Sequence, residues 1–110
     1  MDVVGSAAAI IQLAGVGLTL AKTLYNLYDK GPAGNEQLND LSSYVHITAT
    51  VLEEIGKVFE EESKSTKPLI SNNAITTATE IVTRCSGTFN TLQEMANNAQ
   101  KNTMGLLMLP

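Results

Sequence analysis

Residues 3–21 read VVGSAAAIIQLAGVGLTLA, and these nineteen residues carry no charge. Apolar side chains recur in this stretch at steps of three and four residues, and the pattern continues to Asp29. That spacing is the period of an α-helix. A second apolar row lies beside the first. The predicted helix, from about Val4 to Asp29, therefore has a wide apolar face that protein or lipid should largely surround.

Two further segments repeat the helical spacing. The first runs from about Asn35 to Glu60 and has charged residues on one side, as an amphipathic helix does. The second runs from about Ser71 to Lys101, and the Ser71 hydroxyl is the expected N-cap.

Two breaks separate the three predicted helices. Residues 30–34 contain glycine and proline, which end helices, and residues 60–68 are charged and end in a proline. We therefore predict an all-α fold, an antiparallel bundle of three long helices of similar length. The core seam expected after the N-terminal stretch is Leu24, Leu27, Leu38, Leu41, Val45, Leu52, Ile55, Phe59, Ile81, Cys85, Phe89 and Leu92.

The length of 110 residues suits one domain, residues 1–110. The final stretch, residues 104–110, reads MGLLMLP and carries no charge. We expect it to begin a truncated fourth helix, or a docking strand, because a natural C-terminus seldom ends this way. The domain is then the N-terminal part of a longer protein.

The composition argues against chemistry at a site. Seven basic residues are scattered singly in a chain of net charge −4, so no basic stripe for nucleic acid is present. The single histidine, His46, is interpreted as a residue at the edge of the buried face, and the single cysteine, Cys85, as a packing residue. We predict no enzyme, cofactor, metal site or small-molecule substrate. One cysteine and no Asn-x-Ser/Thr motif suit a cytoplasmic setting.

The N-terminal stretch leaves two interpretations open. As a helix it spans about 28 Å, close to the roughly 30 Å of a bilayer's hydrocarbon core. Small residues four apart would let a neighbouring helix approach closely, in lipid or in protein. The stretch is therefore either a buried core helix or a membrane-active one. The candidate residues for membrane insertion or self-association are Val3, Gly5, Ala9, Ile10, Leu13, Gly17, Leu18, Leu20 and Ala21.

Three parts of the chain resemble a known family. Residues 1–13, MDVVGSAAAIIQL, look like the opening of the HeLo-like N-terminal domains of fungal STAND (NOD-like receptor) proteins. Residues 24–28, LYNLY, fit the end of their first helix, and Cys85, Phe89 and Leu92 match a Cys-x-x-x-Phe-x-x-Leu feature of their third. The resemblance covers nearly the whole chain and rests on packing patterns.

The resemblance implies a helical bundle in front of a larger protein, often ahead of a nucleotide-binding oligomerisation domain. It implies a cell-death effector whose first helix reaches the membrane after oligomerisation. Similar domains also precede fungal regulatory proteins, where no membrane activity is implied. Two hypotheses follow. One is a signalling module that inserts its first helix. The other is a scaffold that binds a second copy of itself or downstream domains of the same protein.

Overall fold

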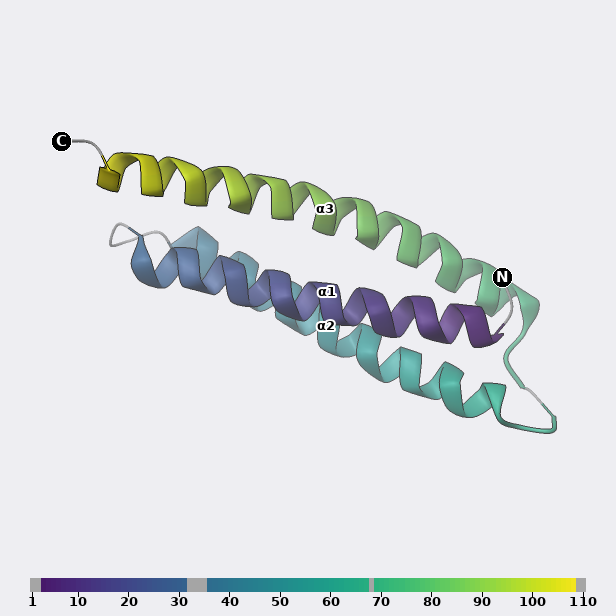
Figure 1. Ribbon diagram of the computed structural model, residues 1–110. Helices are drawn as coiled ribbons and strands as arrows, with labels where there is room; N and C mark the ends of the chain where they lie inside the picture. The colour runs from purple at the N-terminus through teal and green to yellow at the C-terminus, as the bar shows by residue number, and fades with distance from the viewer. Residues whose placement is uncertain (1–2, 32–35, 68, 109–110) are drawn as a thin grey trace.

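The computed structural model describes residues 3–31, 36–67 and 69–108, with side chains described as far as Lys101, and it is all-α (Figure 1). The three helices are α1 (Val3–Lys30), α2 (Glu36–Ser63) and α3 (Asn72–Met108). No strand occurs within these described ranges. The molecule is a rod of 65 × 20 × 18 Å. The all-α prediction, with three helices, is confirmed.

The helix ends differ from the predicted ones in two places. The second helix continues past Glu60 to Ser63, because three successive glutamates favour helix and Lys64 forms an ion pair with Glu60 at 3.8 Å. The third helix runs on to Met108, so residues 104–108 extend α3 and the expected fourth helix does not begin there. No Gly-Pro break precedes these residues, and Leu and Met are good helix formers.

Local polar contacts fix the turn into α3. The Ser71 hydroxyl accepts a hydrogen bond from the backbone N–H of Ala74 at 3.1 Å, so the predicted N-cap is confirmed. The Glu62 carboxylate accepts from the backbone N–H groups of Leu69 and Ile70, the latter at 3.2 Å. Ile70 in turn packs against the core. The connection is thus tied to the end of α2 and to the core.

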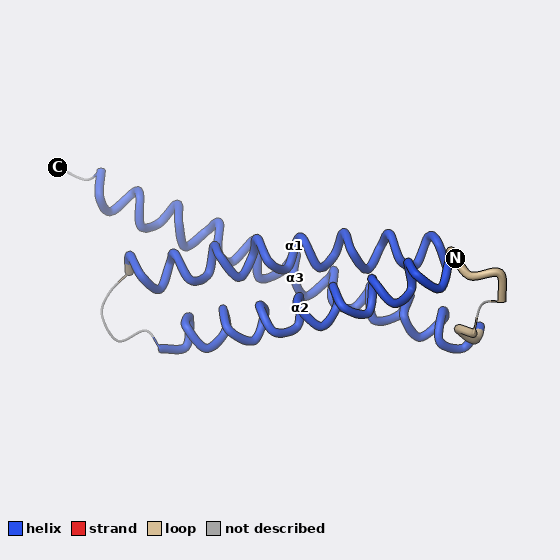
Figure 2. The backbone as a smooth tube through the Cα atoms, turned by 90° about the horizontal axis from the view of Figure 1, so that it is seen from below, coloured by secondary structure: helices blue, strands red, loops and turns tan. Residues whose placement is uncertain are grey.

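The first helix lies at the centre of the arrangement. It runs beside α2 in the opposite direction and beside α3 in the same direction (Figures 1 and 2). Among the described residues it contacts both neighbours, whereas no Cα of α2 lies within 8 Å of a Cα of α3. Towards its C-terminal end α3 diverges from α1 and extends past it. The core is therefore built around α1.

The core consists of small and aliphatic side chains with two phenylalanines. Ile10 and Leu20 of α1 are the largest side chains that are fully buried. Phe59 reaches the core from α2, and Phe89 reaches it from α3. The other buried apolar residues are Ala7, Leu13, Ala14, Ala21, Leu24, Val45, Ala49, Leu52, Ala78 and Ala96.

Two glycines set how closely the helices approach. A Cβ atom on Gly17 would lie 2.8 Å from the Ala49 Cβ of α2 and 2.8 Å from the Phe89 Cε2 of α3. A Cβ atom on Gly56 would lie 2.6 Å from the Ile11 Cγ1 of α1. Such distances are below any normal contact, so only glycine fits between the helices at these two places. Gly15, in contrast, has open space where a Cβ would stand.

We predict that Gly17→Ala and Gly15→Ala change stability in opposite directions. Gly17→Ala should lower the free energy of unfolding by about 1–3 kcal/mol, the usual cost of overpacking, because Ala49 cannot move without its helix. Gly15→Ala should raise it by roughly 0.5–1 kcal/mol, since alanine favours a helix interior. Urea denaturation followed by circular dichroism measures both. Equal effects of the two substitutions would contradict the close approach at Gly17.

Candidate functional site

The predicted N-terminal segment is mostly core. Five of its nine candidate residues are buried, namely Ile10, Leu13, Gly17, Leu20 and Ala21. The other four are half-buried, namely Val3, Gly5, Ala9 and Leu18. Among the described helices α1 alone is long and apolar enough to cross a membrane, a property that the core helix of a soluble protein shares. The segment does not form a free surface, and the exposed apolar residues of α1 include Val4 and Val16.

The predicted core seam divides into residues that pack and residues that do not. Ten of its twelve members are buried or half-buried against the core: Leu24, Leu27, Leu38, Leu41, Val45, Leu52, Phe59, Cys85, Phe89 and Leu92. Ile55 and Ile81 are 38% and 43% exposed, so their assignment to the core is corrected. Both lie on faces that would touch only if α2 and α3 packed against each other. Because these two helices stay apart, the faces remain open.

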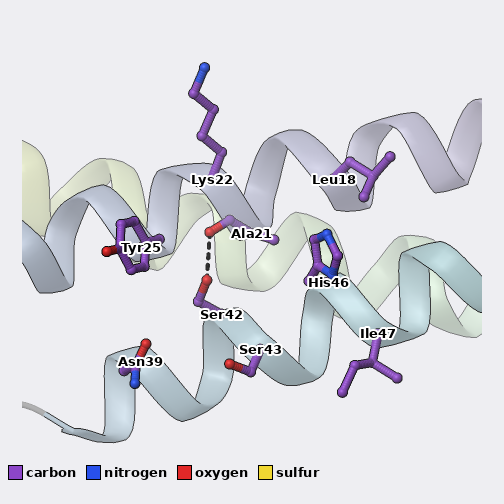
Figure 3. Close-up of a pocket in the computed structure, with 9 residues that line it drawn as sticks. All are labelled: Leu18, Ala21, Lys22, Tyr25, Asn39, Ser42, Ser43, His46 and Ile47. Carbon is purple, nitrogen blue, oxygen red and sulfur yellow. Dashed lines mark hydrogen bonds between the residues drawn. The ribbon is translucent and has the colours of Figure 1, made fainter.

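A shallow cleft lies between α1 and α2 (Figure 3). It has a volume of about 510 Å³ and includes the polar residues Lys22, Asn39, Ser43 and His46. Figure 3 shows the Lys22 side chain extending away from α2, whereas His46 points towards α1. His46 is also exposed, so its position agrees with the edge residue expected from the sequence. These polar groups do not converge on one point, as the polar groups that orient a specific ligand do.

Ser42 makes the hydrogen bond that joins α1 and α2 in this cleft. Its hydroxyl donates to the backbone carbonyl of Ala21 at 2.8 Å, and the residue is buried (Figure 3). Ser6 is a contrast within the same core. Its Oγ is buried and has no hydrogen-bond partner within the part of the chain that the structure describes. One buried hydroxyl therefore holds two helices together, and the other is a cost to stability.

The electrostatics of the described residues are those of a solvated surface. The charge of Glu36, with burial and a 3.5 Å hydrogen bond to it, raises the pKa of Tyr28. A hydrogen bond with Glu53, followed by the charge of Glu54, raises the pKa of Lys57. Both shifts keep the ordinary protonation state at neutral pH. In the described ranges, no group of three His, Cys, Asp or Glu residues is placed to hold a metal ion.

An apolar groove between α2 and α3 is a further feature that the sequence did not predict. It has a volume of about 270 Å³ and lies along the side where the two helices separate. Its lining comes from both helices and consists of Leu41, Tyr44, Val45, Thr48, Arg84, Cys85, Thr88, Phe89 and Leu92. We call it the α2–α3 groove. Cys85, half-buried in this lining, agrees with the packing residue expected from the sequence.

Exposed apolar side chains continue the α2–α3 groove along both helices. Tyr44, Val51 and Val58 recur every seven residues on α2, which places them on one face. On α3, Ile81 and Met95 are also exposed, and each lies three residues along the helix from a residue that lines the groove. The seven-residue spacing of Tyr44, Val51 and Val58 can be read from the sequence. The exposure of this row cannot be read from the sequence, because it depends on where α3 lies.

Comparison with protein-family models, curated proteins and solved structures finds no match for this chain.

We predict that removing the two buried hydroxyls has different effects. Ser42→Ala should lower the free energy of unfolding by about 0.5–1.5 kcal/mol, because the interhelical hydrogen bond to Ala21 is lost. Ser6→Ala should leave it unchanged or raise it by up to about 1 kcal/mol, because a buried unpaired hydroxyl is removed. Each variant is the control for the other in chemical denaturation. Loss of stability in Ser6→Ala as large as in Ser42→Ala would contradict this assignment.

Proposed function

We propose that this chain is a non-catalytic signalling module of the HeLo-like kind that acts by helix–helix association with further copies of itself. In this proposal its three helices work as one antiparallel bundle at the front of a longer cytoplasmic protein of fungal STAND type. The resemblance of residues 1–13, 24–28 and 85–92 to that family supports the proposal. The module needs no cofactor, because it works by contact.

One observation carries the association. Large apolar side chains on α2 and α3 are exposed on both sides of the α2–α3 groove, and Tyr44 and Met95 are the most exposed of them. Contiguous exposed apolar surface on a small soluble domain usually marks a site of protein or membrane contact. Here it lies on two adjacent helices, in rows that match the spacing of helix–helix contacts.

Membrane insertion of α1 is the second candidate, and its length and apolar composition favour it. The central position of α1 in the bundle makes its insertion costly. Four large side chains, Ile10, Leu13, Leu20 and Leu24, are buried in the core. In a bilayer these side chains would again have apolar surroundings, but the faces of α2 and α3 that they cover would be exposed to water, at about 25 cal/mol for each Å² of apolar surface. The net charge of −4 also disfavours approach to anionic lipid. Insertion would therefore require that the bundle opens.

Two Val→Glu substitutions separate the two candidates. Val16 of α1 is 46% exposed and Val51 of α2 is 52% exposed, so either glutamate can reach water without disturbing the core. Val16→Glu puts a charge in the middle of α1, the candidate span among the described helices, where it costs about 2.5–3.5 kcal/mol on insertion. Val51→Glu puts the same charge in the exposed row of α2. Each variant thus controls for the other.

We expect Val51→Glu to weaken self-association at least tenfold and Val16→Glu to leave it unchanged, as measured by sedimentation equilibrium of the full chain. Leakage of dye-loaded anionic phospholipid vesicles is measured on the same samples. Leakage that Val16→Glu abolishes and Val51→Glu preserves would instead establish α1 as a membrane effector. A chain that neither associates nor causes leakage would overturn both candidates.

A further inference from the structure

We propose that the α2–α3 groove binds α3 of a second copy in the reverse direction, so that two copies form a two-fold symmetric dimer. This inference rests on the proposed function and names its surface and its partner. The two α2 helices and the two α3 helices then form a four-helix core between the copies.

The exposed apolar area is enough for such a dimer. Six residues beside the groove are each more than a third exposed: Tyr44, Val51, Ile55, Val58, Ile81 and Met95. Together they expose on the order of 600 Å² per copy, at the upper end for the largest patch of a typical monomer. Two copies would bury roughly 1,200 Å², the lower limit for a specific interface. A dimer of modest affinity is expected from this area.

The charges of α3 favour a second copy over an unrelated helix. Its charged residues, in chain order, are Glu80, Arg84, Glu94 and Lys101, so their signs alternate. When a second α3 runs in the opposite direction, the order of its charges is also reversed, so each acid of one copy can lie opposite a base of the other. A two-fold axis near residues 89–91 brings Arg84 opposite Glu94 of the other copy, and Glu80 opposite Lys101, to within one helical turn. Such self-complementarity is what an isologous interface requires.

Arg84 is also available for an ion pair with another copy. It lines the groove, and it takes part in none of the ion pairs that the described side chains form. The charges of α2 do not favour a pairing of α2 with the α2 of a second copy. In a reversed pairing about Val51, Asp40 would lie opposite Glu62, acid against acid. The geometry therefore favours α3 as the helix that lies on the two-fold axis.

Charge reversal tests the pairing. Arg84→Glu and Glu94→Arg should each raise the dissociation constant of the dimer at least tenfold, because each sets like charges opposite one another across the axis. The double variant should restore it to within a few-fold of the original value, because both contacts return with reversed sign. Sedimentation equilibrium of the full chain measures the constant, and circular dichroism checks that the helical content is unchanged. Lys22→Glu is the matched control, because Lys22 is exposed, extends away from α2 beside the α1–α2 cleft, and is not among the residues that line the α2–α3 groove.

The outcomes are distinct. Restoration by the double variant, with no effect of Lys22→Glu, would establish the interface. A dimer that Val51→Glu weakens but charge reversal does not would overturn this pairing and leave self-association standing. A dimer abolished only by Leu106→Asp would identify the C-terminal tail as the occupant of the groove and overturn the proposal. A monomer at all concentrations would overturn both the pairing and the proposed association.

Discussion

At Gly17 the backbone of α1 meets a side chain from each of the other helices, Ala49 of α2 and Phe89 of α3. The space available there is smaller than one methyl group. The Phe89 ring lies against Gly17, at the place where Ala49 of α2 also meets α1. The absence of a side chain at Gly17 thus lets α1 lie close to both neighbours, which do not approach each other.

This constraint explains why the fold has both a dense core and an open groove. The face of α1 is wide enough to be covered from two directions, so most of its apolar residues are buried. Each outer helix has a narrower apolar face and buries only the part that meets α1. The rest of that face, from Tyr44 to Val58 on α2 and from Ile81 to Met95 on α3, stays in water. Apolar surface that one chain cannot bury is then available to another chain.

The existence and type of the helices could be predicted from the sequence, because they depend on local spacing. The rotation of each helix about its own axis could not. In the third segment two apolar rows lie side by side, and periodicity does not say which one faces the core. The structure turns the row with Phe89 and Ala96 inwards and leaves Ile81 and Met95 outside. In this orientation Phe89 packs against Gly17, a contact between residues 72 positions apart that local periodicity does not encode. The continuous α3 was missed because an apolar end was taken as a new element.

The apolar character of α1 and that of the groove have different consequences for function. Most apolar side chains of α1 are already buried within the chain, so α1 can reach a membrane only after the core is taken apart. The apolar residues beside the groove on α2 and α3 are exposed, so the proposed association would need no rearrangement and would leave α1 in place. Dimerisation would also oppose release of α1, because the partner's helix would hold α2 and α3 in their present positions around it. If the chain has both activities, they belong to different states, and the free energy of the dimer sets the threshold between them.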